Sequence, residues 1–123
     1  MSFTARQPST AKPTVTRWLV LAIACSCLHA RAELAADAVW IDVRTPTEYA
    51  SGHLSEAVSI PFDGIEAGVA RLQLSEDTPI YLYCAVGGRA EVAKQRLEAI
   101  DYNNITNVGS LENARKIRDD NAP

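Results

Sequence analysis

The segment from Pro79 to Ala93, PIYLYCAVGGRAEVA, places the tightest constraint on how this chain can fold. Its first part, Ile80 to Tyr83, is aliphatic and aromatic, as in a buried parallel strand. A bend with Gly87 and Gly88 follows, and a helical segment comes after it. The apolar stripe of that helix is predicted to be Val92, Ala93, Leu97 and Ile100. Cys84 stands where the strand meets the bend, so the pattern predicts a strand, a tight loop and a helix in direct succession.

Strand and helix patterns alternate along the rest of the chain. The expected strands are 39–43, 57–61, 79–83 and 104–108, and the expected helices are 46–50, 63–72, 90–100 and 111–118. Thr45 as N-cap, with Glu48 three positions later, marks the start of the first helix. The alternation predicts one small α/β domain with a parallel sheet and helices on both faces.

Residues 1–32 have the pattern of a secretory signal peptide. A polar, basic start precedes the apolar run WLVLAIACSCL, from Trp18 to Leu28. This run is well short of the roughly 20 residues that a helix needs to span a bilayer. Ala30 and Ala32 provide the small residues of a cleavage site, so we expect cutting after Ala32 and a mature domain over 33–123. An uncleaved membrane anchor is the alternative.

Cleavage changes both the charge and the cysteine content of the chain. It leaves eight of the twelve basic residues against fifteen acidic ones, a net charge of −7. Such a domain is a poor candidate for binding nucleic acid or an anionic membrane. Cys25 and Cys27 leave with the leader, so Cys84 is the only thiol in an oxidising compartment. It is either a small buried hydrophobe or a reactive group.

The position of Cys84 favours the reactive role. It comes at the carboxyl end of a strand and just before a helix, where open α/β sheets bind ligands. Gly87 and Gly88 allow the loop to curl so that its amides point inward, and the helix dipole adds positive charge. In such a place the pKa of a thiol falls from about 8.5 to roughly 3.5–7.5. We therefore expect Cys84 to be a thiolate without a general base.

Two motifs of the chain resemble the single-domain rhodanese family over nearly the whole mature part, from Val39 to Leu111. The first is WIDVRTPTEYASGHLSEAVSIP, and it matches the family at Asp42, Val43, Arg44, Glu48, Tyr49, Gly52, His53, Ala57, Ile60 and Pro61. The second is YLYCAVGGRA, with Cys84, Gly87 and Arg89 at the family's loop positions. The leader makes the chain similar to periplasmic members. It departs from the family at Glu56, Ala90 and Gly109-Ser110.

The resemblance implies sulfur transfer through a persulfide on Cys84. The thiolate would take the outer sulfur of a small anionic donor such as thiosulfate, and pass it to cyanide or a thiol acceptor, including a protein thiol. The loop expected to bind the substrate consists of Ala85, Val86, Gly87, Gly88, Arg89 and Ala90. Its amides would stabilise negative charge on the terminal sulfur. Arg89, its one cation, is expected to steer the donor or hold its sulfonate. We expect an exported monomer without cofactor.

Three other functions compete with sulfur transfer. A phosphatase or arsenate reductase of related fold has five residues between cysteine and arginine, whereas four separate Cys84 from Arg89. A thioredoxin-like oxidoreductase needs a second cysteine. A non-catalytic binding or stress-sensing module with the rhodanese fold is the remaining alternative. The single cation in the loop also leaves the natural donor open.

Other residues of the motifs are predicted to be structural. Asp42 and Arg44 are expected to cap a loop and to pair with Glu48. His53, the only histidine of the mature chain, is expected to be a scaffold residue. The expected core or half-core aromatics are Trp40, Tyr49 and Tyr81. One cysteine, one histidine and scattered carboxylates do not have the spacing of metal ligands, so we expect no metal site.

Overall fold

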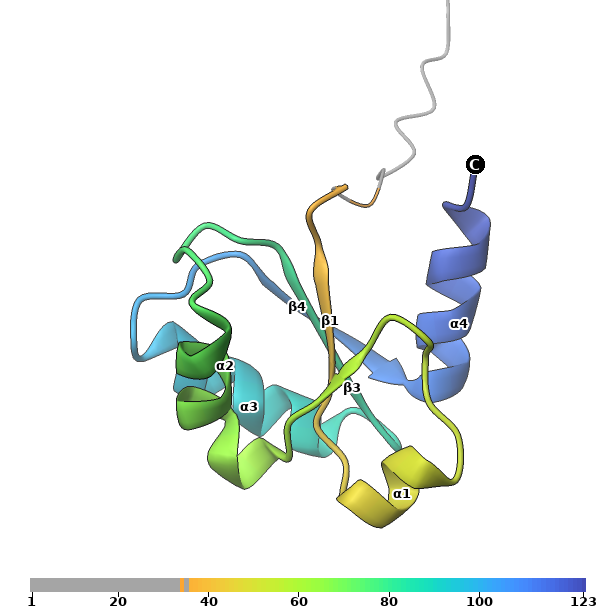
Figure 1. The fold of residues 1–123 in the computed structure, drawn as a ribbon, viewed down its shortest axis with the longest axis horizontal. Coiled ribbons are helices and arrows are strands. Elements are labelled where there is room, and N and C mark those ends of the chain that lie inside the picture. The colour runs from red at the N-terminus through yellow and green to blue at the C-terminus, as the bar shows by residue number, and fades with distance from the viewer. Residues whose placement is uncertain (1–33, 35) are drawn as a thin grey trace, which may run out of the picture. The chain divides into compact units, whose positions relative to one another are not determined.

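A computed structural model describes residue 34 and residues 36–123 of the chain. Its centre is a four-stranded parallel sheet in the order β2-β1-β3-β4 (Figure 1). The strands are β1 (Val39–Asp42), β2 (Val58–Ser59), β3 (Ile80–Cys84) and β4 (Ile105–Ser110). The predicted α/β class and parallel sheet are confirmed. The predicted signal peptide and its cleavage site lie outside the described residues.

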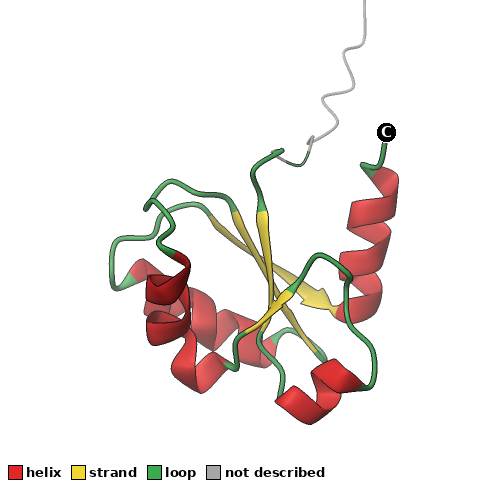
Figure 2. Cartoon of the chain, in the orientation of Figure 1, coloured by secondary structure: helices red, strands yellow, loops and turns green. Residues whose placement is uncertain are grey.

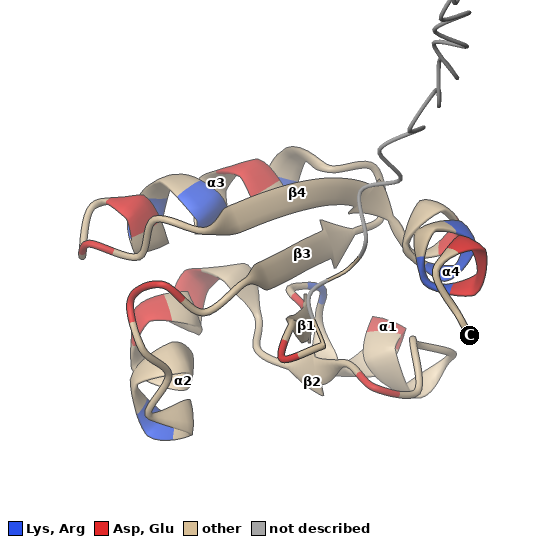
Figure 3. Cartoon of the chain, turned by 90° about the horizontal axis from the view of Figure 1, so that it is seen from above, with Lys and Arg blue, Asp and Glu red and all other residues tan. Residues whose placement is uncertain are grey.

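Helices cover both faces of the sheet, as predicted (Figure 2). They are α1 (Pro46–Ala50), α2 (Ile65–Leu72), α3 (Gly88–Glu98) and α4 (Leu111–Asp120), and a 3-10 turn, η1 (Phe62–Gly64), precedes α2. Viewed from above, α2 and α3 lie on one side of the sheet and α1 and α4 on the other, and both α3 and α4 carry charges of both signs (Figure 3). Within the described residues, no helix is both long and apolar enough to cross a membrane.

Each face of the sheet has its own hydrophobic cluster. The first cluster packs the sheet against α2 and α3: Ile41, Val43, Ile60, Ile65, Val69, Ile80, Leu82, Cys84, Ala90, Ala93, Leu97 and Ile105. The second packs it against the loop after α1 and against α4: Trp40, Leu54, Ala57, Tyr83, Val108 and Ala114. Burial of these side chains removes apolar surface from water and is the main force that holds the layers together. The sheet is therefore fixed from both sides, and its carboxyl edge is a rigid base for a site.

The first helix begins where the sequence predicts. The Thr45 hydroxyl accepts a hydrogen bond from the Glu48 amide, and the Glu48 carboxylate accepts one from the Thr45 amide. This capping box satisfies two amides that have no partner within the helix, and such a cap contributes about 1 kcal/mol. The Glu48 carboxylate also binds Arg89 of α3, beside Cys84.

The apolar stripe predicted for the loop-following helix is half wrong. Ala93 and Leu97 are fully buried, together with Ala90, but Val92 is 40% exposed and Ile100 is 43% exposed. Val92 lies one position, and thus about 100°, away from the buried stripe. Ile100 comes after the end of α3 at Glu98, where helical periodicity no longer sets its direction.

Several predicted boundaries also move. The expected strand 57–61 is reduced to Val58–Ser59, the expected helix 63–72 starts at Ile65, and the last helix continues to Asp120. The strand β4 also changes, since it runs to Ser110 instead of ending at residue 108. Its pairing with β3 shifts register between Leu82 and Tyr83, so that one extra residue is accommodated. This bulge turns the end of β4 towards the Cys84 loop.

Candidate active site

Cys84 is the last residue of β3, and it pairs with Ser110 at the end of β4. It therefore lies at the carboxyl edge of the sheet, as the sequence predicts. Its side chain is buried, at 1% exposure, and belongs to the cluster that packs against α2 and α3. A substrate must reach it through the loop that leads into α3.

The loop after Cys84 directs backbone amides at the sulfur. The Gly87 amide donates a hydrogen bond to Sγ over 2.9 Å. Burial tends to raise the pKa of the Cys84 thiol, but the amides of Ala90, Val86, Gly87 and Arg89 favour the thiolate and the net pKa is lowered. Four of the six expected loop residues thus act on the sulfur through their amides. Ala85 directly follows Cys84, and Gly88 is the first residue of α3.

Only one of the two loop glycines is required by the backbone. Gly87 has φ 100°, and a Cβ there would lie 3.3 Å from the Cα of Gly109. Gly88 is the first residue of α3, and a Cβ on it would have no neighbour within 4 Å. The left-handed Gly87 is what turns its amide onto Sγ.

Asn107 of β4 holds this loop in place, a role that the motifs of the sequence do not predict. Its side-chain amide donates to the carbonyl of Gly87 over 3.0 Å and to the carboxylate of Glu91 over 3.1 Å. Its side-chain oxygen accepts from the Gly109 amide over 3.0 Å. One side chain therefore ties the turn of the loop to the bulge of β4. The sequence feature that could have indicated this role is an asparagine inside a predicted strand, because asparagine is uncommon in strands.

Arg89, the single cation of the loop, is already paired. Its guanidinium donates two hydrogen bonds to the Glu48 carboxylate, over 2.8 and 2.9 Å. The pair joins the first turn of α3 to α1, and its side chains are 30% and 36% exposed. The Arg89 bonds and the capping bonds from Thr45 hold the pKa of Glu48 far below its usual range. The carboxylate is thus ionised wherever the domain is folded at ordinary pH.

The predicted pairing of Arg44 and Asp42 with Glu48 is wrong. Arg44 binds Asp42 instead, with Nε to Oδ1 at 2.9 Å and Nη2 to Oδ2 at 2.6 Å. Nη2 also donates to the Gly52 carbonyl over 2.7 Å, and the guanidinium lies 5.7 Å from the centre of the Tyr83 ring. The strand end brings Asp42 and Arg44 together within three residues, whereas Glu48 faces the Cys84 loop. Their structural role is nevertheless the one predicted.

The histidine and the aromatic residues fit the structural roles predicted for them. His53 Nδ1 is 2.8 Å from the Tyr49 carbonyl, and its ring stacks on the Tyr49 ring at 3.6 Å between centroids. Trp40 is buried and stacks on the half-buried Tyr81. No group of three His, Cys, Asp or Glu side chains among the described residues has the geometry to hold a metal ion.

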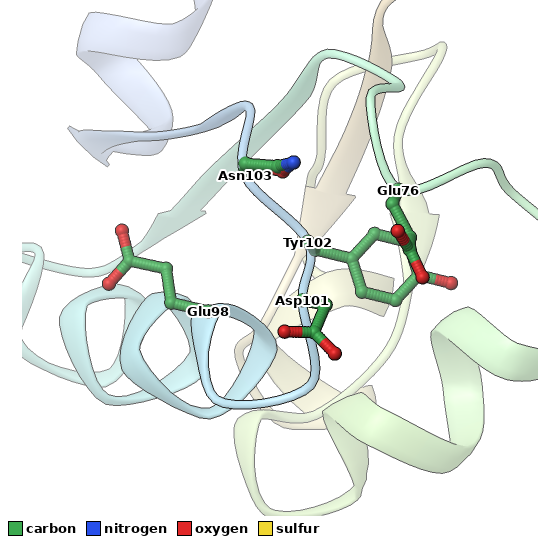
Figure 4. A pocket seen from close by; sticks show the side chains of 5 residues that line it. All are labelled: Glu76, Glu98, Asp101, Tyr102 and Asn103. Carbon is green, nitrogen blue, oxygen red and sulfur yellow. The ribbon is translucent and has the colours of Figure 1, made fainter.

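Two cavities differ in how they relate to Cys84. A cavity of about 240 Å³ opens beside Arg89 and is lined partly by Val43, a residue of the same buried cluster as Cys84. A larger cavity, of about 520 Å³, is lined by Glu76, Glu98, Asp101, Tyr102 and Asn103 (Figure 4). It lies between the end of α3 and the segments that lead into β3 and β4, at the opposite edge of the sheet. Its three carboxylates oppose binding of an anion, whereas the smaller cavity is lined by Arg89, the cation of the Cys84 loop.

Comparison with known proteins agrees with the fold. Residues 27–115 match the family described as Rhodanese-like domain, and the chain belongs to this family. It is 30% identical over 73 residues to the thiosulfate sulfurtransferase PspE of Escherichia coli K12, covering 59% of this chain and 70% of that protein. A solved E. coli structure, titled rhodanese with anions, superposes with a TM-score of 0.59 at 29% identity, covering 62% of this chain and 89% of the other.

A second group of relatives shares only this domain. The chain is 34% identical over 93 residues to a tRNA uridine(34) hydroxylase of E. coli. That match covers 71% of this chain but 27% of the hydroxylase, so the chain spans about a quarter of its length. The sulfurtransferase relatives support sulfur transfer as the general class of activity.

Proposed function

We propose that this chain is an exported sulfurtransferase that carries a sulfane sulfur as a persulfide on Cys84. The donor is thiosulfate or a related compound, and the acceptor is cyanide or a thiol, which includes protein thiols. The amide cradle around Sγ supports this proposal most directly, because it lowers the pKa of a buried thiol whose burial alone would raise it. A thiol that only filled the core would have no use for such a cradle.

The first half of the reaction is a displacement at sulfur. The Cys84 thiolate attacks the outer sulfur of thiosulfate, a new S–S bond forms on Sγ, and the S–S bond of the donor breaks. The electron pair of that bond leaves with sulfite. In the second half the acceptor attacks the terminal sulfur, and Cys84 returns as the thiolate. No electron enters or leaves the site, so neither half needs an outside oxidant or reductant.

The loop supplies stabilisation for the intermediate. Negative charge on the terminal sulfur of the persulfide lies beyond Sγ, at the mouth of the ring of amides from Val86, Gly87, Arg89 and Ala90. One preorganised donor of this kind, where water is excluded, is worth roughly 3 kcal/mol. Asn107 keeps Gly87 in place through its carbonyl, so the cradle does not have to reorganise during the reaction. Four residues between Cys84 and Arg89 make a tight ring, which suits one sulfur atom better than a phosphate.

Export and a monomeric state belong to the same proposal. The leader pattern in residues 1–32 supports export to the periplasm and release of a domain over 33–123. The acidic balance of that domain supports small anions or thiols as partners, and not nucleic acid or an anionic membrane. The hydroxylation in the second relative's name is not part of the proposal, because the match covers 27% of that protein.

Intact mass spectrometry of the secreted protein tests the proposal. The protein is measured as purified, after brief exposure to thiosulfate, and again after cyanide is added. We expect a chain that begins at Glu33, gains the mass of one sulfur atom with thiosulfate and loses it to cyanide. A folded chain that takes no sulfur from thiosulfate or from any organic sulfane donor would instead support the non-catalytic binding module.

The variant Cys84→Ser gives the sharpest prediction about the carrier. Serine keeps the size of the side chain but has no nucleophilic thiolate, so we expect loss of thiocyanate formation with little change in melting temperature. Circular dichroism provides the folding control. Turnover above a few per cent of the wild-type rate in a correctly folded variant would show that another group carries the sulfur.

A further inference from the structure

The mouth of the Cys84 loop offers no free cation among the described residues that line it. The guanidinium of Arg89 is bound in two places by Glu48. Arg44, the other arginine beside the cavity of about 240 Å³, is bound in the same way by Asp42 and is almost completely buried. A donor that approaches Cys84 therefore meets two charges that are already neutralised by carboxylates.

The surface next to this paired arginine is mainly apolar, with Thr45 and Asp63 as its other polar residues besides Arg44. The cavity beside Arg89 is lined mainly by carbon, from Val43, Pro46, Pro61 and Phe62. At the tip of the loop, Val86 is 89% exposed. An apolar side chain held out in this way, two residues from the thiol, is a contact surface for an apolar group.

The paired arginines and the mainly apolar cavity are expected to bind two kinds of sulfane donor with different free energies. Thiosulfate is a small dianion, and it loses hydration on entry without gaining a free cation in return. Glu48 adds a carboxylate at the same mouth, and the mature chain is acidic overall. A donor with one negative charge and an uncharged organic group loses less hydration free energy on entry than thiosulfate does. Its carbon atoms also gain by leaving water for the apolar cavity.

We propose that the Cys84 site is selective for sulfane donors that carry a small, uncharged organic group, and that Glu48 determines this specificity. The inference rests on the proposed function and narrows its donor. Glu48 acts by occupying Arg89, which would otherwise bind the anionic part of thiosulfate. The organic group lies in the cavity formed by Pro46, Pro61 and Phe62, and the single charge of the donor lies on the sulfur that is transferred.

The chemical step is the same as with thiosulfate and balances in the same way. With benzenethiosulfonate, the thiolate of Cys84 takes the terminal sulfur, and the S–S bond of the donor breaks. The electron pair leaves with benzenesulfinate, and the persulfide on Cys84 keeps the charge of the attacking thiolate. Only the group behind the reacting bond differs between the donors, so rates can be compared directly.

The test measures kcat/KM for three donors with cyanide as acceptor: thiosulfate, methanethiosulfonate and benzenethiosulfonate. The methyl compound removes one charge from thiosulfate, and the phenyl compound adds apolar area. Reactivity without enzyme is measured for each donor and used to normalise the rates. We expect the normalised kcat/KM of the phenyl donor to exceed that of thiosulfate by about tenfold to a hundredfold, with the methyl donor between them.

The variant Glu48→Gln tests the part assigned to the carboxylate. Glutamine at this position preserves the capping box with Thr45 but releases Arg89 from its full ion pair. We expect kcat/KM for thiosulfate to rise by about tenfold, and that for benzenethiosulfonate to change by less than about twofold. The matched control is Glu56→Gln, which removes a carboxylate paired with Arg118 of α4 and leaves the ratio of the two donors unchanged. The ratio does not depend on how much of the protein is folded.

The variant Phe62→Leu tests the cavity separately. The smaller side chain reduces contact with the phenyl group, so kcat/KM for benzenethiosulfonate falls by several fold while that for thiosulfate stays within about twofold. Thiosulfate as the best donor, with a donor ratio that Glu48→Gln does not alter, would overturn this inference and leave the proposed function intact. Failure of all three donors to place sulfur on Cys84 would instead overturn the proposed function itself.

Discussion

This domain has two arginine–carboxylate pairs that differ in burial and, as a result, in their roles. Arg44 binds Asp42 at the end of β1, and the side chains are 11% and 0% exposed. Arg89 binds Glu48 between α3 and α1, and the side chains are 30% and 36% exposed. The first pair is enclosed by the protein, and its charges have no alternative partner in water. The second pair lies at the mouth of the Cys84 loop, where water or a substrate can compete for it.

Burial decides what each pair does. Charges taken out of water are expensive unless they stay paired, so the buried pair locks the strand end, the Gly52 loop and the Tyr83 ring together. An exposed pair contributes little to stability because water screens it. The Glu48–Arg89 pair is therefore able to affect substrate choice at small cost to folding. Changing each pair in turn tests this division.

Breaking the buried pair should have the largest effect. Arg44→Met keeps the length of the side chain and the backbone amide that donates to Asp42, but it leaves the buried carboxylate without a cation. We expect a loss of about 3–5 kcal/mol in the free energy of unfolding. Urea denaturation provides the measurement. Arg71→Met on the exposed surface of α2 is the control and should stay within about 0.5 kcal/mol. A loss below about 1 kcal/mol in the Arg44 variant would mean that the buried pair is not structural.

The two loop glycines, Gly87 and Gly88, differ in the space that is available for a side chain. Gly87→Ala forces a side chain into left-handed backbone 3.3 Å from Gly109, and it should cost about 1–3 kcal/mol and slow persulfide formation. Gly88→Ala has open space at the start of α3, and it should be neutral or stabilising by up to about 1 kcal/mol. Denaturation and persulfide formation are measured for both. Equal costs at the two positions would show that the φ of Gly87 does not shape the cradle.

The sequence predicts the parts of this site that depend on neighbouring residues. The strand, the bend and the helix around Cys84 are adjacent in the chain, so their pattern places the thiol and its amides, and Thr45 with Glu48 predicts the start of α1. The partner of Arg89 lies 41 residues away, and nothing in the local sequence indicates that Glu48 binds this arginine. Asn107 was missed for a related reason. Its contacts with Gly87 depend on a bulge in β4, which is set by how two strands align.

Removing the cation of the exposed pair should affect binding more than folding. Arg89→Ala leaves Glu48 without its partner at the loop mouth, so we expect KM for thiosulfate to rise by roughly tenfold, with a smaller fall in kcat and little change in melting temperature. The double variant Glu48→Gln/Arg89→Ala should recover much of the loss, because the repelling carboxylate is gone. A fall in kcat alone would instead assign Arg89 to stabilising the transition state.

The smallest effect should be that of Arg89 on the thiol itself. The pKa of Cys84 is lowered by loop amides acting against burial, so the pH midpoint of alkylation by iodoacetamide should lie below the value of about 8.5 for an unperturbed cysteine. Because the folded-state pKa is the lower one, the thiolate contributes stability above the unfolded pKa, and this contribution is lost as the pH falls through the folded one. Arg89→Ala keeps its backbone amide and removes a guanidinium that interacts with Cys84 less than with Glu48, so it should move the midpoint only slightly.

A midpoint that returned to the unperturbed value in Arg89→Ala would contradict this assignment, because it would mean that the guanidinium, and not the amides, sustains the thiolate. Gly87→Ala is the matched comparison, since it disturbs the amide that donates to Sγ over 2.9 Å and keeps every charge. It should raise the midpoint more than Arg89→Ala does. That order would separate the two components of the loop: backbone amides that activate the sulfur, and a side-chain pair that affects which donor reaches it.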